Sequence, residues 1–269
     1  MISKYFLKTM LKNPNLWGWG VLFMLFWIFM GAFVFTSGFP HQEIYFKLNA
    51  SLWFGLISLV SASTMATSIS YSIYYGNSSL AYALRFTTLK PSSYISSFML
   101  STAIIGGALS GIMLGMTFVM FSYKSGYLLV PVFHYISVIA GIAAGAFMFL
   151  LASIIIIIFN NYLGLRNVSF ASFIPMILTY LFGFTQFNVG LPSYIIYGSP
   201  FTDISDIFVW SYFGHRIPLN MLKPIGSGNQ INPEIQIMIL AMWIIILMMC
   251  SFFLIRRIEP KSIEEGRQI

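Results

Sequence analysis

The sequence predicts an all-α integral membrane protein with six transmembrane helices in a single transmembrane domain, residues 1–269. First, all 14 basic and seven acidic side chains lie outside six charge-free stretches, each longer than the ~20 residues that a helix needs to cross a bilayer. Second, charged residues make up 8% of the chain, against about 25% in soluble domains. Third, the stretches are continuously apolar, whereas barrel strands alternate apolar and polar residues. The stretches are residues 13–42, 48–84, 91–123, 125–165, 167–202 and 235–255.

The first predicted element is a helix over residues 1–14 that lies in the headgroup layer of the membrane. Lys4, Lys8 and Lys12 are four residues apart and form one stripe of this helix, a pattern typical of an interfacial amphipathic helix. Asn13-Pro14 should end it, because proline disfavours helical geometry in the residue before it. Alternatively, the lysines serve only as charged anchors. The opposite side carries Ile2, Tyr5, Phe6, Thr9 and Met10.

The six spans follow in order. We expect them at about 16–38, 49–74, 94–122, 132–159, 168–190 and 235–255. The second span is rich in serine and threonine, which either pack helices closely or line a substrate path. Small residues at four-residue spacing predict tight helix contacts in the third span, at Gly107, Gly111 and Gly115, and in the fourth, at Gly141 and Gly145. Pro175 predicts a kink in the fifth span.

Two connecting segments have patterns of their own. Residues 76–91 place Leu80, Ala83 and Leu84 at helical spacing between Gly76 and Pro91, which predicts a short amphipathic helix at the membrane surface. Residues 191–233 begin with an apolar stretch broken at Gly198-Ser199-Pro200. That break predicts two short helices that dip into the outer leaflet or rest on it. Asp203 and Asp206 would then lie near a helix N-terminus, where negative charge is favourable.

The basic residues predict the orientation. Six spans put both termini on one side together with ten lysines and arginines, and leave four on the other side. The positive-inside rule therefore makes the termini cytoplasmic and predicts a multi-pass plasma-membrane protein. The net charge of +7 reflects this orientation and does not indicate nucleic-acid binding.

Several kinds of chemistry are absent from the sequence. No GxxxxGK[ST] phosphate loop occurs, so we expect neither ATP binding nor catalysis in this chain, and no cofactor or metal site. No charged residue lies within a predicted span, which argues against proton-coupled transport. The single cysteine, Cys250, is interpreted as a small core residue. His41, His134 and His215 are interpreted as interfacial side chains rather than metal ligands.

The order of these features resembles the ABC-2 type permeases, which are the membrane subunits of ABC exporters. Lys12-Asn13-Pro14 is similar to the family's basic helix followed by Asn/Asp-Pro. The 191–233 segment resembles the family's two short extracellular helices. Residues 76–94 resemble its coupling segment, G-x-L-E-x-L-x-x-T-P-L-x-x-x-x-Y, if two residues are inserted after the glycine. The matching residues are Gly76, Leu80, Leu84, Thr87, Leu89 and Tyr94; the departures are Ala81 at the acidic position and Thr87-Thr88 for Thr-Pro.

The resemblance implies a mechanism. Two permease subunits, identical or paralogous, would pair in the lipid membrane and bind two ATP-binding cassette subunits, which hold ATP and magnesium. The helix around 79–86 would fit a groove in the ATPase. Its anchors would be Leu80, Leu84 and Phe86, with Arg85 as a charged contact, and Gly76, Thr87 and Leu89 belong to the same coupling segment. The path between the two permease subunits would be lined by spans two and five, through Ser61, Thr64, Thr67, Phe184 and Phe187, and would carry an apolar or amphipathic drug, peptide or lipid.

Other readings of the sequence remain open. An ATP-independent secondary transporter or channel would use the same six spans without a partner ATPase. A structural or assembly protein of the membrane would carry no transport role. The substrate, and whether the permease pairs with itself or with a paralogue, are not encoded in any motif of this sequence.

Overall fold

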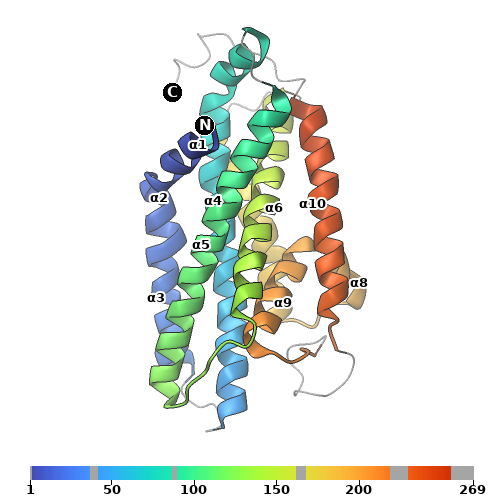
Figure 1. The fold of residues 1–269 in the computed structure, drawn as a ribbon. Helices are drawn as coiled ribbons and strands as arrows, with labels where there is room; N and C mark the ends of the chain where they lie inside the picture. Colours follow the sequence, from blue (N-terminus) through green and yellow to red (C-terminus); the bar gives the residue numbers. More distant parts are fainter. Residues whose placement is uncertain (1, 37–41, 87–89, 162–167, 219–229, 256–269) are drawn as a thin grey trace.

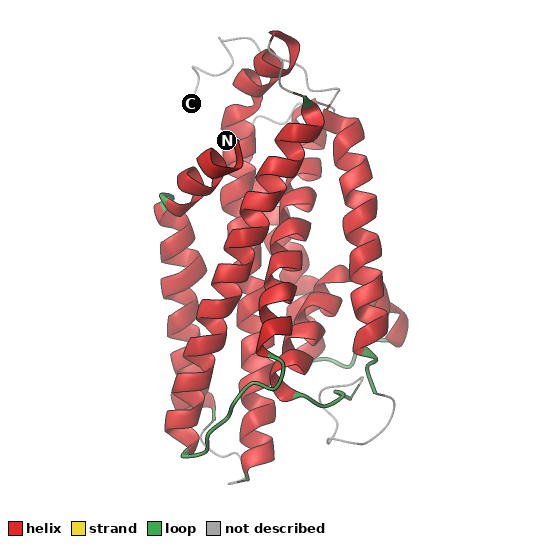
Figure 2. Cartoon of the chain, viewed as in Figure 1, coloured by secondary structure: helices red, strands yellow, loops and turns green. Residues whose placement is uncertain are grey.

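The computed structural model describes residues 2–36, 42–86, 90–161, 168–218 and 230–255, without the side chains of residues 2, 75–85, 160, 161, 168 and 169. Within these ranges the chain is a bundle of long helices joined by short loops (Figures 1 and 2) and contains no β-strand. Six of its helices are long and apolar enough to cross a membrane. The predicted fold class is confirmed at that level.

The first span is a composite helix preceded by a short separate one. The helix α1 (Ile2–Leu11) ends before Asn13, whose side chain accepts a hydrogen bond from the backbone N–H of Asn15 at 3.0 Å. Pro14 then occupies the first helical position, where its missing N–H costs nothing. The predicted break is therefore confirmed. The span consists of α2 (Pro14–Trp17), the π-helix η1 (Gly18–Leu22), α3 (Phe23–Met30) and the π-helix η2 (Gly31–Phe35).

The next three spans are continuous helices: α4 (Glu43–Phe86), α5 (Pro91–Ser125) and α6 (His134–Asn161). The predicted break at Gly76 is wrong, because α4 continues through it to Phe86, 12 residues beyond the end of the candidate span at Tyr74. One glycine costs only about 1 kcal/mol inside a helix, and the leucines and alanines that follow it favour helical geometry. The predicted surface helix is the last part of α4.

The last two spans enclose a pair of short helices. The fifth span consists of α7 (Val168–Leu178), the π-helix η3 (Thr179–Phe184) and the short 3₁₀-helix η4 (Thr185–Phe187). Pro175 lies inside α7, and the departure from α-helical geometry follows it at Thr179. The short helices α8 (Ser193–Gly198) and α9 (Pro200–Phe213) come next, and α10 (Pro233–Ile255) is the sixth span. The predicted pair of short helices is therefore present, with its break at Ser199.

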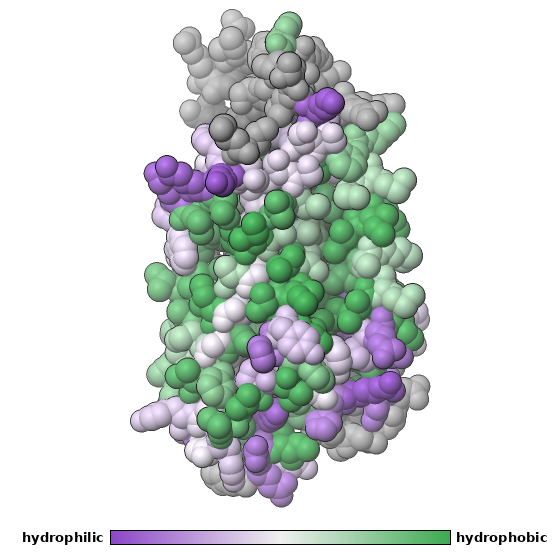
Figure 3. Space-filling view, viewed as in Figure 1, coloured by the Kyte–Doolittle hydropathy of each residue, from purple (hydrophilic) through white to green (hydrophobic). Residues whose placement is uncertain are grey.

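The bundle has two distinct ends. Helix α1, the start of α5 and the end of α10 lie at one end, which we call the α1 end; α9 lies toward the other, which we call the α9 end (Figure 1). The last part of α4 projects past the neighbouring helices at the α1 end. Figure 3 shows a largely hydrophobic band across the middle of one face, with hydrophilic residues at α1 and toward the α9 end. This pattern is the one expected of a chain whose middle lies in lipid.

Helix α4 is the centre of the bundle. It is the most buried of the six candidate spans and contacts α5, α6, α7 and α9, whereas α10 is the least buried. Cys250 lies on the exposed side of α10, so its interpretation as a core residue is wrong. A hydrophobic pattern cannot distinguish a side that faces lipid from one that faces protein, because both surroundings are apolar.

Helices α5 and α6 approach each other closely at their glycines. A Cβ atom on Gly106 would overlap the carbonyl oxygen of Gly141, and one on Gly145 would overlap that of Thr102. The predicted contact face of the fourth span is therefore confirmed. That of the third span is partly wrong, because nothing lies within 4 Å of a Cβ atom at either Gly111 or Gly115. The contact with α6 is made by the neighbouring face of α5, which includes Thr102 and Gly106. The four-residue spacing of glycines did not predict this face.

Candidate functional site

The α8–α9 pair is inserted into the bundle rather than resting on it. Pro200 starts α9 after the extended residue Ser199, and Gly214 ends it in a left-handed conformation, with its N–H donating to the carbonyl oxygen of Trp210 at 2.8 Å. Thirteen of the 14 residues of α9 are buried, against α4, α6, η3 and α10. Helix α4 approaches α9 closely at Gly55, where a Cβ atom would lie 2.9 Å from the carbonyl oxygen of Ser205.

Five buried polar side chains meet at α9, and we call them the acid cluster: Gln186 from η4, Asp203, Ser205 and Asp206 from α9, and Gln236 from the first turns of α10. The Asp206 carboxylate accepts hydrogen bonds from Gln186 Nε2 at 2.9 Å and from Gln236 Nε2 at 2.5 Å. Gln186 Nε2 also donates to Ser205 Oγ, and Ser205 donates to the carbonyl oxygen of Thr202 at 2.9 Å. The three segments are therefore joined through one carboxylate.

Asp203 is equally buried but has no such partners. Neither of its side-chain oxygens has a hydrogen-bond partner in the described part of the chain. Burial, and then the nearby charge of Asp206, raises the pKa of Asp203 to about 9. Burial also raises the pKa of Asp206, to about 7, although the hydrogen bonds from Gln236 and Gln186 oppose that rise. Between about pH 7 and pH 9, Asp203 therefore holds its proton while Asp206 is ionised.

The acid cluster corrects one expectation from the sequence. Asp203 and Asp206 were expected near the outer surface, and the interior was expected to hold no acidic group; both side chains have no exposed surface. Asp203 does lie in the first turn of α9, as predicted. Apart from these carboxyls, α9 carries only apolar or aromatic residues and the small hydroxyls Thr202, Ser205 and Ser211 on all sides, which is the pattern of a buried helix. That pattern could have indicated burial of the two aspartates.

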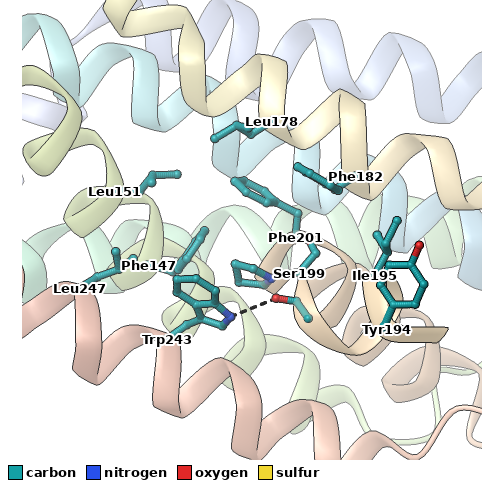
Figure 4. A pocket seen from close by; sticks show the side chains of 12 residues that line it. Phe147, Leu151, Leu178, Phe182, Tyr194, Ile195, Ser199, Phe201, Trp243 and Leu247 are labelled. Atoms are coloured by element: carbon teal, nitrogen blue, oxygen red, sulfur yellow. Dashed lines mark hydrogen bonds between the residues drawn. The ribbon is translucent and has the colours of Figure 1, made fainter. Parts of the chain in front are cut away.

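An open apolar groove lies beside the break between α8 and α9, and we call it the α9 groove. It has a volume of about 450 Å³ and is lined from α6, α7, η3, the α8–α9 pair and α10. Figure 4 shows Phe147, Phe182 and Phe201 around it, and Trp243 Nε1 closes one side by donating to the carbonyl oxygen of Gly198 at 3.2 Å. The hydroxyl of Ser199 lines the groove without a hydrogen-bond partner in the described structure. Such a lining suits an apolar chain rather than a charged solute.

A second apolar groove, of about 370 Å³, lies between spans one, two and five, and we call it the span-one groove. Phe184, a predicted path residue, lines it together with Trp27, Trp53 and Tyr180. The structure therefore brings Phe184 together with residues of the first span, which the sequence prediction did not include in the path.

The other predicted path residues have different surroundings. Ser61 is buried and donates to the carbonyl oxygen of Gly20 in span one at 2.7 Å, so it joins two helices. Thr64 donates to the carbonyl oxygen of Ser61 at 2.8 Å, and Thr67 to that of Ser63 at 3.4 Å. These contacts favour packing over a path for the hydroxyls of span two. Phe187 is half-buried, and neither groove is lined by it.

The predicted coupling residues are only partly described. Phe86, the last residue of α4, is 78% exposed at the α1 end. Gly76, Leu80, Leu84 and Arg85 lie on the helical backbone of α4, and their side chains are outside the described structure. Thr87 and Leu89 lie outside the described residues altogether.

Helix α1 is amphipathic and lies against the start of α5. Phe6 stacks on Phe98 with ring centroids 4.4 Å apart, and Ser101 Oγ donates to the carbonyl oxygen of Ser3 at 2.8 Å. Met10, which the sequence places on the side opposite the lysines, is also buried, whereas Tyr5, placed on the same side, is exposed. Lys4, Lys8 and Lys12 are exposed.

The fold and the site define a helical bundle with six helices able to cross a membrane, two apolar grooves and a buried pair of carboxyls. No group of three or more His, Cys, Asp or Glu residues suited to a metal ion occurs in the described ranges. His134 and His215 are separate and exposed, and His41 lies outside those ranges. The chain matches no protein-family model and no curated protein.

Proposed function

We propose that this chain is the membrane subunit of an ATP-driven exporter of the ABC-2 type, working with a separate ATP-binding cassette subunit. The observation that carries the proposal is the helical extension of α4 at the α1 end. It continues the most buried span past the end of the candidate membrane-crossing segment at Tyr74 to Phe86, which is exposed. A rigid helix that begins in the core and ends outside it can transmit a push from a bound partner to the core.

The partner would meet two elements at the same end of the bundle. The exposed basic stripe of α1 and the projecting end of α4 both lie at the α1 end (Figure 1). In this proposal the α1 end faces the cytoplasm of a plasma membrane, in keeping with the excess of lysine and arginine there. Two ATPase copies would hold the ATP and magnesium, and this chain would perform no catalysis itself.

A second permease subunit, a copy or a paralogue, would complete the export path. The span-one groove supports this part of the proposal, because it opens between spans one, two and five and includes the path residue Phe184. Its aromatic lining favours an apolar or amphipathic cargo such as a drug, peptide or lipid. Ser61, Thr64, Thr67 and Phe187 would support the helices beside the path.

The test is a double substitution on the α4 extension, Leu80→Asp with Leu84→Asp, in the chain purified with its ATPase partner. Two aspartates on one apolar face should prevent docking, because each would place an unpaired charge in the partner's groove. We expect transport and permease-stimulated ATP hydrolysis to be lost while the chain still folds. Unchanged hydrolysis and transport in the double variant would refute the coupling role.

A matched control uses the same charges on the opposite side of the helix. Ser78 and Tyr82 have the same four-residue spacing, and they lie about 160° around the helix from Leu80 and Leu84 at 100° per residue. Ser78→Asp with Tyr82→Asp should leave docking intact. Helical content from circular dichroism should be equal in both double variants.

The acid cluster favours a second candidate function, an ATP-independent secondary transporter. Buried acidic groups in membrane proteins often belong to ion or proton pathways, and Asp203 and Asp206 are of that kind. This candidate requires that the chain alone, in liposomes, move a solute when an ion gradient is imposed. Transport only in the presence of ATP and an ATPase partner would exclude it.

A further inference from the structure

The acid cluster has no part in the proposed coupling to an ATPase. It lies toward the α9 end, away from the α4 extension (Figure 1), and none of its five side chains lines the α9 groove or the span-one groove. Its side chains come from η4, α9 and α10, three segments that are far apart in sequence. Such an arrangement of buried polar groups needs an explanation of its own.

The hydrogen bonds of the acid cluster are unbalanced. Asp206 accepts from two amide donors, so its carboxylate is satisfied in the ionised form. Three further acceptor atoms, Asp203 Oδ1, Asp203 Oδ2 and Gln236 Oε1, are buried with no donor among the described residues. Because Gln236 also donates to Asp206, its unpartnered oxygen lies in the cluster. Acceptors gathered without donors would be satisfied by a proton or another positively charged species bound among them.

No protein cation fills that role in the described structure. Asp203 and Asp206 form no ion pair there. The elements packed on α9 do carry ionisable groups, but these are exposed or half-buried, toward the ends of α4, α6 and α10: Glu43, Lys47, His134 and Glu234. Among the described tyrosine side chains of these elements, Tyr45, Tyr135, Tyr180 and Tyr194 are exposed, Tyr71 and Tyr74 are half-buried, Tyr197 accepts from the N–H of Asn232, and Tyr212 donates to the carbonyl oxygen of Leu129.

We propose that the acid cluster is a proton-binding site, in which Asp203 carries one exchangeable proton while Asp206 remains ionised between the two glutamine amides. The proton converts one orphaned oxygen of Asp203 into an O–H donor and removes the uncompensated charge. The pKa values have the same order, with Asp203 titrating at about 9 and Asp206 at about 7.

In this proposal the packing of α9 against α10 and η4 depends on pH. With the proton bound to Asp203, the only charge on α9 is the Asp206 carboxylate, which accepts hydrogen bonds from the Gln186 and Gln236 amides. Without it, two neighbouring carboxylates face each other in a buried site, and α9 is pushed from α10 and η4. The α9 groove beside Ser199 belongs to the same helix, so its shape should change with the state of this proton.

Infrared titration of the purified full chain in detergent tests the proposal. At about pH 8, between the pKa values of Asp206 and Asp203, the wild type should show a protonated-carboxyl C=O band that is lost as the pH rises through about 9. Asp203→Asn should abolish that band. Asp206→Asn should keep it but move its loss to lower pH, because the neighbouring charge that favours the proton has gone. Exposed Glu234→Gln is the matched control and should leave both band and titration unchanged.

Three results would overturn the assignment: a band at about pH 8 that survives Asp203→Asn, no band in the wild type at that pH, or a band lost on adding sodium at constant pH, which would indicate a metal-cation site. Asparagine matches the shape of aspartate, and circular dichroism checks folding. If Asp203→Asn does not fold, Asp206→Asn decides alone. If the band of Asp206→Asn is lost at the same pH as that of the wild type, the proposed interaction between the two carboxyls is refuted. The titration needs no ATPase, so its outcome is independent of the exporter proposal.

Discussion

Replacing Asp203 by asparagine should remove the pH dependence of stability between neutral and alkaline pH. The folded pKa of Asp203, about 9, lies above its unfolded value of about 4. The stability tied to this proton is therefore complete below about pH 4 and is lost progressively as the pH rises through about 9. Asp206 contributes in the same direction, but only up to about pH 7.

The size of the effect follows from proton linkage. One proton bound by the folded state but not by the unfolded chain changes stability by about 1.4 kcal/mol per pH unit. Between pH 7 and pH 9 the wild type should lose about 2.7 kcal/mol. At about 2–4 °C per kcal/mol for a chain of this size, the apparent melting temperature should fall by about 5–10 °C.

The assay is thermal unfolding of the purified chain in detergent, followed by circular dichroism across this pH range. In Asp203→Asn the melting temperature should be independent of pH above about pH 7. Below about pH 7 it should still change with pH, because Asp206 is unchanged. Glu234→Gln, which changes an exposed carboxyl on α10, should follow the wild type. A wild-type profile without a slope between pH 7 and pH 9, or a slope that persists in Asp203→Asn, would refute the reasoning.

Two further predictions concern packing and orientation. Gly145→Leu should lower stability by about 1–3 kcal/mol because its side chain would enter the backbone of α5, whereas Gly115→Leu, with open space around it, should be nearly neutral; thermal unfolding compares them. With Cys250→Ser as background, a charged maleimide added to intact cells should label Lys124→Cys but label Lys8→Cys only after lysis. The reverse pattern would overturn the proposed orientation, since both side chains are exposed at opposite ends of the bundle.

The two proposals for this chain use opposite ends of one helical bundle. The coupling role depends on the α1 end and on α4, and the proton site depends on α9 at the other end. Helix α4 contacts α9 directly, with Gly55 against Ser205. A displacement of α4 by a partner would therefore shift α9 and change the contacts of the acid cluster.

Much of the architecture was predictable from the sequence because it follows from local rules. Charge-free stretches long enough to cross a bilayer predicted all six spans. Asn13-Pro14 predicted the end of the N-terminal helix, and the break at Gly198-Ser199-Pro200 separated α8 from α9 as expected. These features depend on the chain's own backbone and on its lipid surroundings, so they need no knowledge of neighbouring helices.

The tertiary structure alone decided which face of each helix meets protein. Four-residue spacing placed Gly111 and Gly115 on one stripe, but the close contact with α6 runs through Gly106, and Cys250 faces outward. Lipid and protein interior are equally apolar, so hydrophobicity carries no information about this choice. Asp203 and Asp206 became a buried pair because α9 is inserted among α4, α10 and the fifth span, and that insertion depends on helices distant in sequence.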